Sequence, residues 1–142
     1  MPAPYNQLYV HCVWATWDRL PLITQQIEQQ VYASILAKCE ALGCTAVAIG
    51  GIDDHVHLLV RFPPALPLVK LIGEVKGASS HLVTHKLEPQ SFFKWQASYG
   101  VFTVSMRSLD NVAAYVRNQK QRHAHNMLLP ALEHCADPTT NI

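Results

Sequence analysis

Asp53-Asp54-His55-Val56-His57-Leu58-Leu59-Val60, near the middle of the 142-residue sequence, is the stretch that most constrains the fold. Gly50 and Gly51 precede it and mark a turn, and the β-branched and aliphatic residues after the turn predict a strand. Residues two apart in a strand point to the same face, so the imidazoles of His55 and His57 are expected side by side. The opposite face is apolar and should form the core. The histidine pair fits two ligands of a metal ion, and it also fits two ordinary, partly exposed strand histidines.

Length and composition favour one globular domain. The sequence is 49% hydrophobic and 15% charged, as in globular proteins, and it is long enough to bury a core. We expect a single domain over residues 1–132 and a short tail over 133–142. No apolar run reaches the roughly 18 residues that span a bilayer, and the N-terminus lacks the basic and apolar regions of a signal peptide. These features predict a cytoplasmic protein without a membrane partner.

Cysteine spacing and net charge give little functional information. The four cysteines, Cys12, Cys39, Cys44 and Cys135, contain no CxxC and are expected to be free thiols in a reducing compartment. A zinc site made by Cys39, Cys44 and a histidine is a weak alternative. The net charge of +1 with neutral histidines does not indicate a nucleic-acid binder, so any basic surface must come from local clustering.

Hydrophobic periodicity predicts four strands and three helices. The strands are expected over 5–16, over 44–51, in the histidine run before Pro63, and over 99–105. The helices are expected from Thr24, as N-cap, to about Leu42, from Pro67 to about Leu87, and from Leu109, after Ser108 as N-cap, to about Asn126. The order β-α-β-β-α-β-α predicts an α+β fold, a ferredoxin-like two-layer sandwich with an antiparallel sheet, helices on one face and an additional C-terminal helix. The histidine side of the sheet must then face substrate, solvent or this final helix.

Two segments have both a structural and a functional interpretation. The second helix carries polar residues away from its apolar stripe, namely Lys70, Lys76, Ser79, Ser80 and Lys86. They fit a solvated face, which composition favours, or a face that contacts phosphates. The segment Phe92-Phe93-Lys94-Trp95-Gln96 fits either closure of the core or stacking on nucleic-acid bases.

Tyr115 and Gln119 lie four residues apart in the last expected helix, so they share one face, one turn apart. Taken alone, such a tyrosine is usually a packing residue. The interpretation changes because several motifs occur together in one order: His11-x-Val13-Trp14-x-Thr16, the histidine pair after an aspartate, Lys76-Gly77-x-Ser79-Ser80, Trp95-Gln96-x-x-Tyr99-Gly100-x-Phe102-x-Val104-Ser105, and Tyr115-x-x-x-Gln119.

This ordered set, from Tyr5 to about His125, resembles the single-tyrosine transposases of the insertion-sequence 200/605 group and their REP-associated relatives. These are His-hydrophobic-His (HUH) endonucleases. The resemblance implies a transposase that cleaves and rejoins single-stranded DNA through a covalent 5′-phosphotyrosine and recognises hairpin DNA at element ends. It also implies that His55, His57 and Gln119 hold a divalent metal ion and that Tyr115 is the nucleophile.

The implied ligand set, two imidazoles and an amide oxygen, suits Mg²⁺ or Mn²⁺, and ligand type alone also admits zinc. The phenol has an unperturbed pKa near 10, so Tyr115 needs a helper that the sequence does not identify. The resemblance further implies a homodimer whose two sheets join and in which the Tyr115 helix can complete the partner's site. Residues 106–108 would then be the hinge before that helix.

The residues expected to contact DNA are Arg19, Arg61, Lys70, Lys76, Ser79, Ser80, Lys94, Arg107 and Arg122. Two other functions compete with the transposase. One is a DNA-binding protein that has lost transposition and keeps only hairpin recognition. The other is a ferredoxin-like regulatory or structural domain in which the histidines are incidental.

Overall fold

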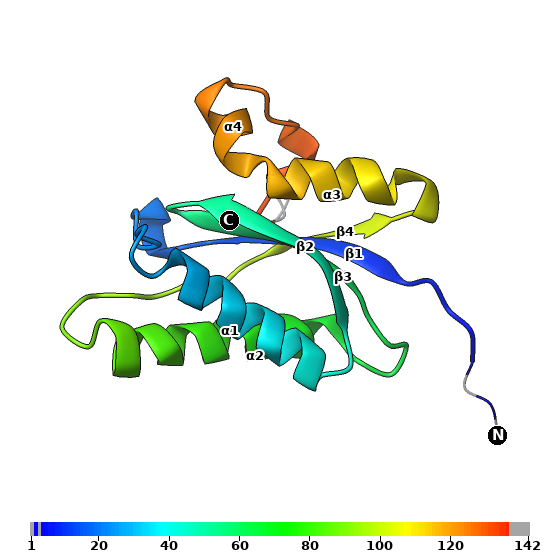
Figure 1. The fold of residues 1–142 in the computed structure, drawn as a ribbon, viewed down its shortest axis with the longest axis horizontal. Helices are drawn as coiled ribbons and strands as arrows, with labels where there is room; N and C mark the ends of the chain where they lie inside the picture. Colours follow the sequence, from blue (N-terminus) through cyan, green and yellow to red (C-terminus); the bar gives the residue numbers. More distant parts are fainter. Residues whose placement is uncertain (1, 3, 137–142) are drawn as a thin grey trace.

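A four-stranded antiparallel sheet lies between two layers of helices in the computed structural model, which describes residues 2 and 4–136 (Figure 1). The strands are β1 (Tyr9–Ala15), β2 (Thr45–Ile52), β3 (His55–Arg61) and β4 (Gly100–Val104), in the spatial order β2-β3-β1-β4. The main helices are α1 (Glu28–Ala41), α2 (Leu68–Leu82), α3 (Leu109–Arg117) and α4 (Gln119–Ala124). Short turns of other helix types cover Trp17–Arg19 (η1), Val83–Leu87 (η2), Met106–Ser108 (η3) and Pro130–Leu132 (η4). The predicted α+β class is confirmed, and the chain follows the predicted element order.

The histidine strand β3 is an inner strand of the sheet, paired on both sides. Its first residue, His55, lies opposite Ile52 of β2, so the two-residue turn Asp53-Asp54 closes this hairpin. On its other side His57 lies opposite Val13 of β1. Inner position and tight turn together fix the register of the two histidines, because a slip of one residue would turn both side chains to the other face.

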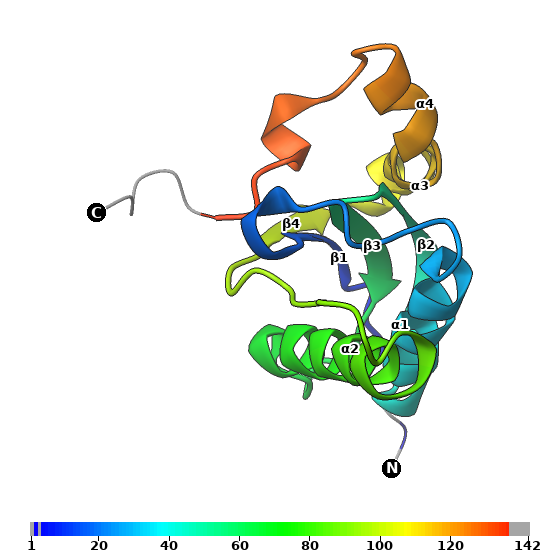
Figure 2. The same cartoon turned by 90° about the vertical axis from the view of Figure 1, so that its left-hand side faces the viewer.

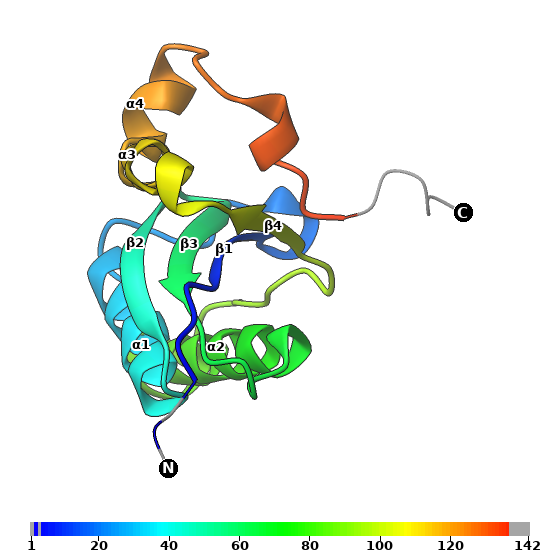
Figure 3. The ribbon, with the colours of Figure 1, turned by 90° about the vertical axis from the view of Figure 1, so that its right-hand side faces the viewer.

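The apolar face of β3 forms the main core, as its alternation predicts. Val56, Leu58 and Val60 are fully buried there against α1 and α2, which together cover this face of the sheet (Figures 1 and 3). The other face carries a smaller apolar cluster, in which Leu59 packs with Ala113 and Val116 of α3. The sequence predicts that the histidine side of the sheet faces substrate, solvent or the final helix. In the structure it faces the final helix.

Two predicted helix boundaries are wrong. Thr24 does not cap the first helix, which begins at Glu28 after a turn in which the Thr24 carbonyl accepts the N–H groups of Ile27 and Glu28. The expected single C-terminal helix is interrupted at Asn118, whose φ of −100° and ψ of 25° leave the helical region. Asparagine is a weak helix former, and the interruption gives α4 its own direction above the sheet (Figure 1).

The other boundary shifts are small. The first strand begins at Tyr9 instead of Tyr5, because Tyr9 lies opposite the last residues of both neighbouring strands, Arg61 and Val104. Before α3, the capping side chain is that of Ser105, whose Oγ accepts the N–H of Ser108 at 3.3 Å.

After α4 the chain turns back across the helix-α3 side of the sheet and brings residues 133–136 next to β4 and η1 (Figure 2). The rest of the expected tail, residues 137–142, lies outside the described residues, and the division at residue 132 stays a prediction. Within the described part of the chain, none of the helices combines the length and apolar character that crossing a membrane requires.

Candidate metal and nucleophile site

His55 and His57 are both buried, at 1% and 0% exposure, on the sheet face that α3 and α4 cover. Their Nε2 atoms face one carboxylate, that of Glu133. His55 Nε2 lies 3.3 Å from Oε1 of Glu133, and His57 Nε2 lies 3.2 Å from its Oε2. The strand alternation thus brings the two imidazoles together as the sequence predicts, with the same nitrogen of each ring directed into the site.

The opposite nitrogen of each ring has its own partner. His55 Nδ1 lies 2.7 Å from Oδ1 of Asp54, and His57 Nδ1 lies 2.7 Å from Nε2 of His11. Each ring is therefore fixed by a contact at Nδ1, the nitrogen that faces away from Glu133. In known metal sites the non-ligating N–H of a histidine is usually donated to a carboxylate, a backbone carbonyl or water, and the His55–Asp54 pair follows that pattern.

Tyr115 and Gln119 reach the site from α3 and from the first residue of α4. The Tyr115 ring packs edge-on against His57, with 5.8 Å between ring centroids, and Gln119 Oε1 lies 3.4 Å from His55 Nε2. The Gln119 amide donates to the Tyr115 carbonyl at 3.1 Å. The predicted shared face survives the interruption at Asn118, because this bond keeps the two residues one turn apart.

Glu133 and Leu129 are the functional candidates that the sequence reasoning missed. The Tyr115 hydroxyl donates to Oε2 of Glu133 at 2.5 Å, and the backbone N–H of Leu129 donates to the same hydroxyl at 3.1 Å. Both residues lie in the segment after α4, which has no periodicity and no recognisable motif. Only the three-dimensional path of the chain brings them to the tyrosine.

His123 and Arg122 of α4 complete the surroundings. His123 Nε2 lies 3.2 Å from His55 Nε2 and 3.1 Å from Gln119 Oε1, so it competes with a metal ion for the same two ligand atoms. The Arg122 guanidinium lies over the Tyr115 ring, 4.6 Å from its centroid. This is a cation–π contact, in which the face of the ring attracts the positive charge of the arginine.

Burial and hydrogen bonding shift the ionisation of these groups in different directions. Burial lowers the pKa of His55, but the bonds with Asp54 and Glu133 outweigh it and raise that pKa to about 9. Burial dominates at His57 and lowers its pKa. Burial raises the pKa of Tyr115, and the bond to Glu133 raises it further. Burial also opposes ionisation of Glu133, yet the proximity of the His55 and His57 imidazoles holds its pKa well below the usual range.

The donor set fits a divalent metal ion. Among the described residues, one group of histidine, cysteine, aspartate or glutamate side chains is compact enough to share an ion, and it consists of His55, His57 and Glu133, whose ligand atoms all lie within 4.8 Å of one another. The buried Nε2 of His57 lies 3.2 Å from Oε2 of Glu133 but makes no hydrogen bond of good geometry with any described group, so a metal ion bound there would displace no well-formed hydrogen bond. The alternative zinc site at Cys39 and Cys44 gains no support, and both cysteines are free thiols within the described range.

Two of the residues expected to contact DNA, Arg19 and Arg122, contact residues of this site, and a third, Lys94, contacts Trp17 of η1, the turn that also carries Arg19. Arg19 Nη1 is 3.8 Å from Oδ1 of Asp54, Arg122 covers Tyr115, and Lys94 lies 4.1 Å from the centroid of the exposed Trp17 ring.

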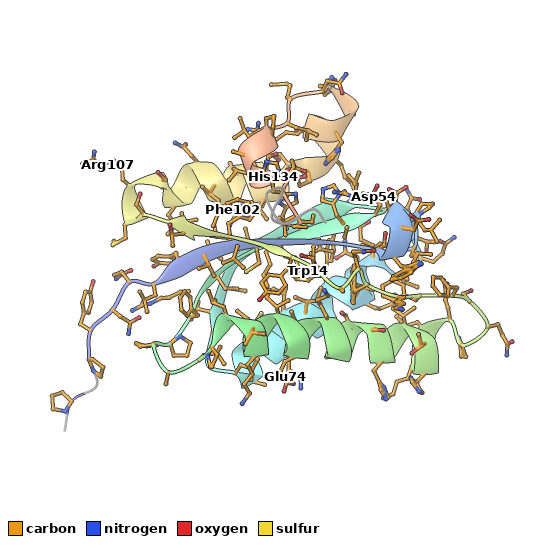
Figure 4. All side chains as sticks on the ribbon, turned by 180° about the vertical axis from the view of Figure 1, so that it is seen from behind. Trp14, Asp54, Glu74, Phe102, Arg107 and His134 are labelled. Carbon is orange, nitrogen blue, oxygen red and sulfur yellow. The ribbon has the colours of Figure 1, made fainter. Side chains whose placement is uncertain are left out.

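The other six expected residues lie away from the site. Four are on α2, beyond the sheet, where Lys76 donates to the Gln96 carbonyl at 2.5 Å and Ser79 accepts from the Trp95 indole. Arg61, at the end of β3, donates to the Asn6 carbonyl. Arg107 lies at the far end of α3 from Asp54 (Figure 4). The remaining members of the α2 group are Lys70 and Ser80.

Fold and site together define an α+β protein in which a buried His-x-His pair on an inner strand faces a tyrosine from a covering helix. The chain belongs to the IS200-like transposase family, whose model matches residues 4–119. It is therefore a transposase by family, in a class of enzymes that cleave DNA and transfer strands.

Individual relatives agree with this assignment. The ISDra2 transposase TnpA of Deinococcus radiodurans is 22% identical over 121 residues, which cover 82% of this chain and 86% of that protein. A crystal structure of a D. radiodurans protein assigned as a transposase has a TM-score of 0.65 and 25% identity, covering 84% of this chain and 95% of that one. A REP-associated tyrosine transposase bound to a REP hairpin shares the fold, with a TM-score of 0.61 and 15% identity over 89% of this chain and 76% of that one.

Proposed function

We propose that this transposase cleaves and rejoins single-stranded DNA through a covalent 5′-phosphotyrosine at Tyr115, in a reaction that needs a divalent metal ion. The observation that supports this most is convergence on Glu133. The phenol of Tyr115 and the Nε2 atoms of His55 and His57 all contact that one carboxylate. The nucleophile and two metal ligands therefore share a single small volume.

The metal ligands in this proposal are His55, His57 and the Oε1 atom of Gln119, with Glu133 as a carboxylate ligand in the DNA-free protein. Nitrogen and oxygen donors of this kind suit Mn²⁺ or Mg²⁺. A bound divalent ion would polarise a phosphodiester oxygen and help to orient the scissile phosphate.

Tyr115 supplies the covalent chemistry. Its phenol oxygen forms a bond to phosphorus while the bond from phosphorus to the 3′ oxygen breaks, so that the strand leaves as a 3′ hydroxyl. In this structure Glu133 accepts the hydrogen bond of the phenol and the N–H of Leu129 donates to the same oxygen, so the hydroxyl is held beside the histidines. The phenol loses its proton as the new bond forms, and the departing 3′ oxygen gains one. Because the phosphotyrosine conserves the bond energy, a 3′ hydroxyl can reverse the step and rejoin DNA.

The proposed substrate is a DNA hairpin with a single-stranded cleavage site. Arg19 and Arg122 lie beside the site, Lys94 lies over Trp17 of η1, and all three can contact phosphates, which supply most of the affinity in protein–DNA binding. The exposed Trp17 beneath Lys94 offers a ring on which a base can stack. Tyr115 itself is only 1% exposed, so DNA reaches it when the segment that carries Leu129 and Glu133 shifts.

The decisive experiment mixes purified protein with labelled single-stranded hairpin DNA taken from around its own gene, with Mn²⁺ or with chelator, and resolves the products on a denaturing gel. We expect a covalent protein–DNA band that requires the metal ion. Tyr115→Phe should abolish this band, whereas Tyr9→Phe, which removes a phenol hydroxyl bonded to Gln7 at the other end of β1, should retain it.

The same experiment separates the competing functions. A hairpin retarded on a native gel without any Tyr115-dependent adduct would favour a protein that keeps only hairpin recognition. Absence of both signals would favour a structural domain in which the histidines are incidental.

We also propose that the protein acts as a homodimer. Within the described residues the outer edges of β2 and β4 pair with no further strand, and such edges are where two sheets can join. Exchange of the Tyr115 helix between subunits would be compatible with this arrangement, because residues 105–108 separate α3 from β4.

A further inference from the structure

His11 is a buried histidine from the first sequence motif that the proposed reaction does not use. It lies on β1, opposite Leu59, and thus on the same sheet face as His57. The two rings stack, with 4.9 Å between centroids and 17° between planes, and His11 Nε2 lies 2.7 Å from His57 Nδ1.

Packing alone does not account for a histidine at this position. A neutral imidazole has one N–H and one bare nitrogen, and the Nδ1 of His11 has no hydrogen-bond partner among the described residues. Either tautomer therefore leaves one buried polar atom unpaired, which costs free energy. A phenylalanine would fill this space, next to the ring of Phe102, without that cost.

The other ring nitrogen of His11, Nε2, does have a partner, the Nδ1 of His57. His57 can bind a metal ion through Nε2 only if its proton is on Nδ1, and a buried Nδ1–H needs an acceptor. We propose that His11 is a positioning residue that accepts the Nδ1–H of His57, fixes its ring, and leaves the Nε2 lone pair free for a divalent metal ion. This inference rests on the proposed function, since it assigns a partner to one of the proposed ligands.

Each of the two ligand histidines then has a hydrogen-bond acceptor at Nδ1, but the two acceptors differ in charge. Asp54 accepts from His55 with a charged carboxylate, which makes that imidazole a stronger donor to a metal ion. His11 accepts from His57 with a neutral ring, which orients the imidazole and adds little to its basicity. This asymmetry is specific to the geometry of β1 beside β3.

The test compares three variants with the native protein. His11→Phe keeps the ring and removes the acceptor. His11→Gln provides an amide oxygen that can accept from Nδ1–H. Phe102→Leu removes the other ring packed against His11, at 5.6 Å, and serves as the packing control. Two readouts are used, the tautomer of His57 from ¹H–¹⁵N correlation spectra of the metal-free, histidine-labelled proteins, and the Kd for Mn²⁺ alone from calorimetry.

We expect His57 to carry its proton on Nδ1 in the native protein. In His11→Phe the proton should move to Nε2, where Glu133 is the remaining acceptor, and Mn²⁺ binding should weaken by about tenfold or more. His11→Gln should restore most of both properties, and Phe102→Leu should change neither.

An Nε2–H tautomer in the native protein overturns the inference, as does unchanged Mn²⁺ binding in His11→Phe, or equal weakening in Phe102→Leu. The tautomer of the native protein is informative even if a variant fails to fold. Failure of the proposed function has a different signature, because a missing Tyr115 adduct leaves the tautomer result standing.

Discussion

At the scale of single residues, two opposing effects act on the pKa of His55. Its side chain is almost fully buried, which disfavours the imidazolium, yet it lies between the carboxylates of Asp54 and Glu133. The carboxylates prevail, and the pKa of His55 reaches about 9. At neutral pH this pKa corresponds to an imidazolium between two anions, and the proposed divalent cation would take the place of that proton between the same groups.

This arrangement predicts how stability depends on pH in the presence of a chelator. The unfolded chain releases the His55 proton near pH 6.5 and the folded protein releases it near 9. The contribution is therefore complete below pH 6.5 and is lost as the pH rises to 9. It amounts to about 3 kcal/mol at most, and denaturant unfolding at several pH values measures it.

Asp54→Asn should flatten this alkaline decline, because it removes one of the two anions that stabilise the imidazolium. Asp53→Asn, in the same turn but exposed, is the matched control and should keep the native pH profile. A stability that rises between pH 6.5 and 9 would contradict the assignment of charge to His55.

Sequence reasoning predicts the residue pairs of the site that depend on local spacing, and misses those that do not. His55 and His57 follow from strand alternation, and Tyr115 and Gln119 follow from one helical turn. The pair His11–His57, 46 residues apart, depends on strand register, and Tyr115–Glu133 depends on the course of an irregular segment. Neither pairing has a local signal in the sequence.

At the scale of elements, the contact between α3 and β2 positions Tyr115, the proposed nucleophile. A Cβ atom at Gly50 of β2 would lie 2.1 Å from the carbonyl oxygen of Val116, next to Tyr115 in α3. A residue without a side chain is therefore required for the helix to approach the sheet this closely. The position of the phenol over the histidines depends on that approach.

Gly50→Ala should consequently destabilise the protein by roughly 1–3 kcal/mol and slow formation of the Tyr115 adduct, since α3 must move away from β2. Gly73→Ala in α2 is the control, because its Cβ would have no described atom within 4 Å and alanine favours a helix by about 0.5–1 kcal/mol over glycine. Denaturant unfolding and adduct kinetics measure both effects. Native stability and rate in Gly50→Ala would show that α3 is not held in this way.

The elements themselves were predicted well where hydrophobic periodicity is strong. The alternation of β3 identifies its core face, and the apolar stripe of α2 identifies the helix that covers it. The interruption at Asn118 was missed because residues 109–126 keep a helical pattern throughout. The residue before the interruption, Arg117, donates to the Val47 carbonyl of β2, and a local pattern does not encode such a contact between distant residues.

At the scale of the whole molecule, the sheet separates the main hydrophobic core from the candidate site. The layer of α1 and α2 builds the main core on one face, while α3, α4 and the segment after them surround the histidines on the other (Figures 1 and 2). In this structure α3 packs on β2 and β3 of its own chain, and Tyr115 contacts His57 of the same chain. Within this chain the proposed nucleophile and the proposed metal ligands therefore lie close enough to form one site.

This single-chain assembly can be tested by mixing two inactive variants, Tyr115→Phe and His57→Ala, under conditions that allow subunits to exchange. Each site built within one chain keeps one defect, so we expect no covalent adduct from the mixture. In a dimer that exchanges the Tyr115 helix, a site would combine the intact His57 of one chain with the intact Tyr115 of the other, and an adduct would form on the His57→Ala chain. Mixing native protein with His57→Ala gives a second test, since sites built within one chain should give adduct on native chains alone. An adduct on the His57→Ala chain would establish helix exchange and replace the single-chain site with a shared one.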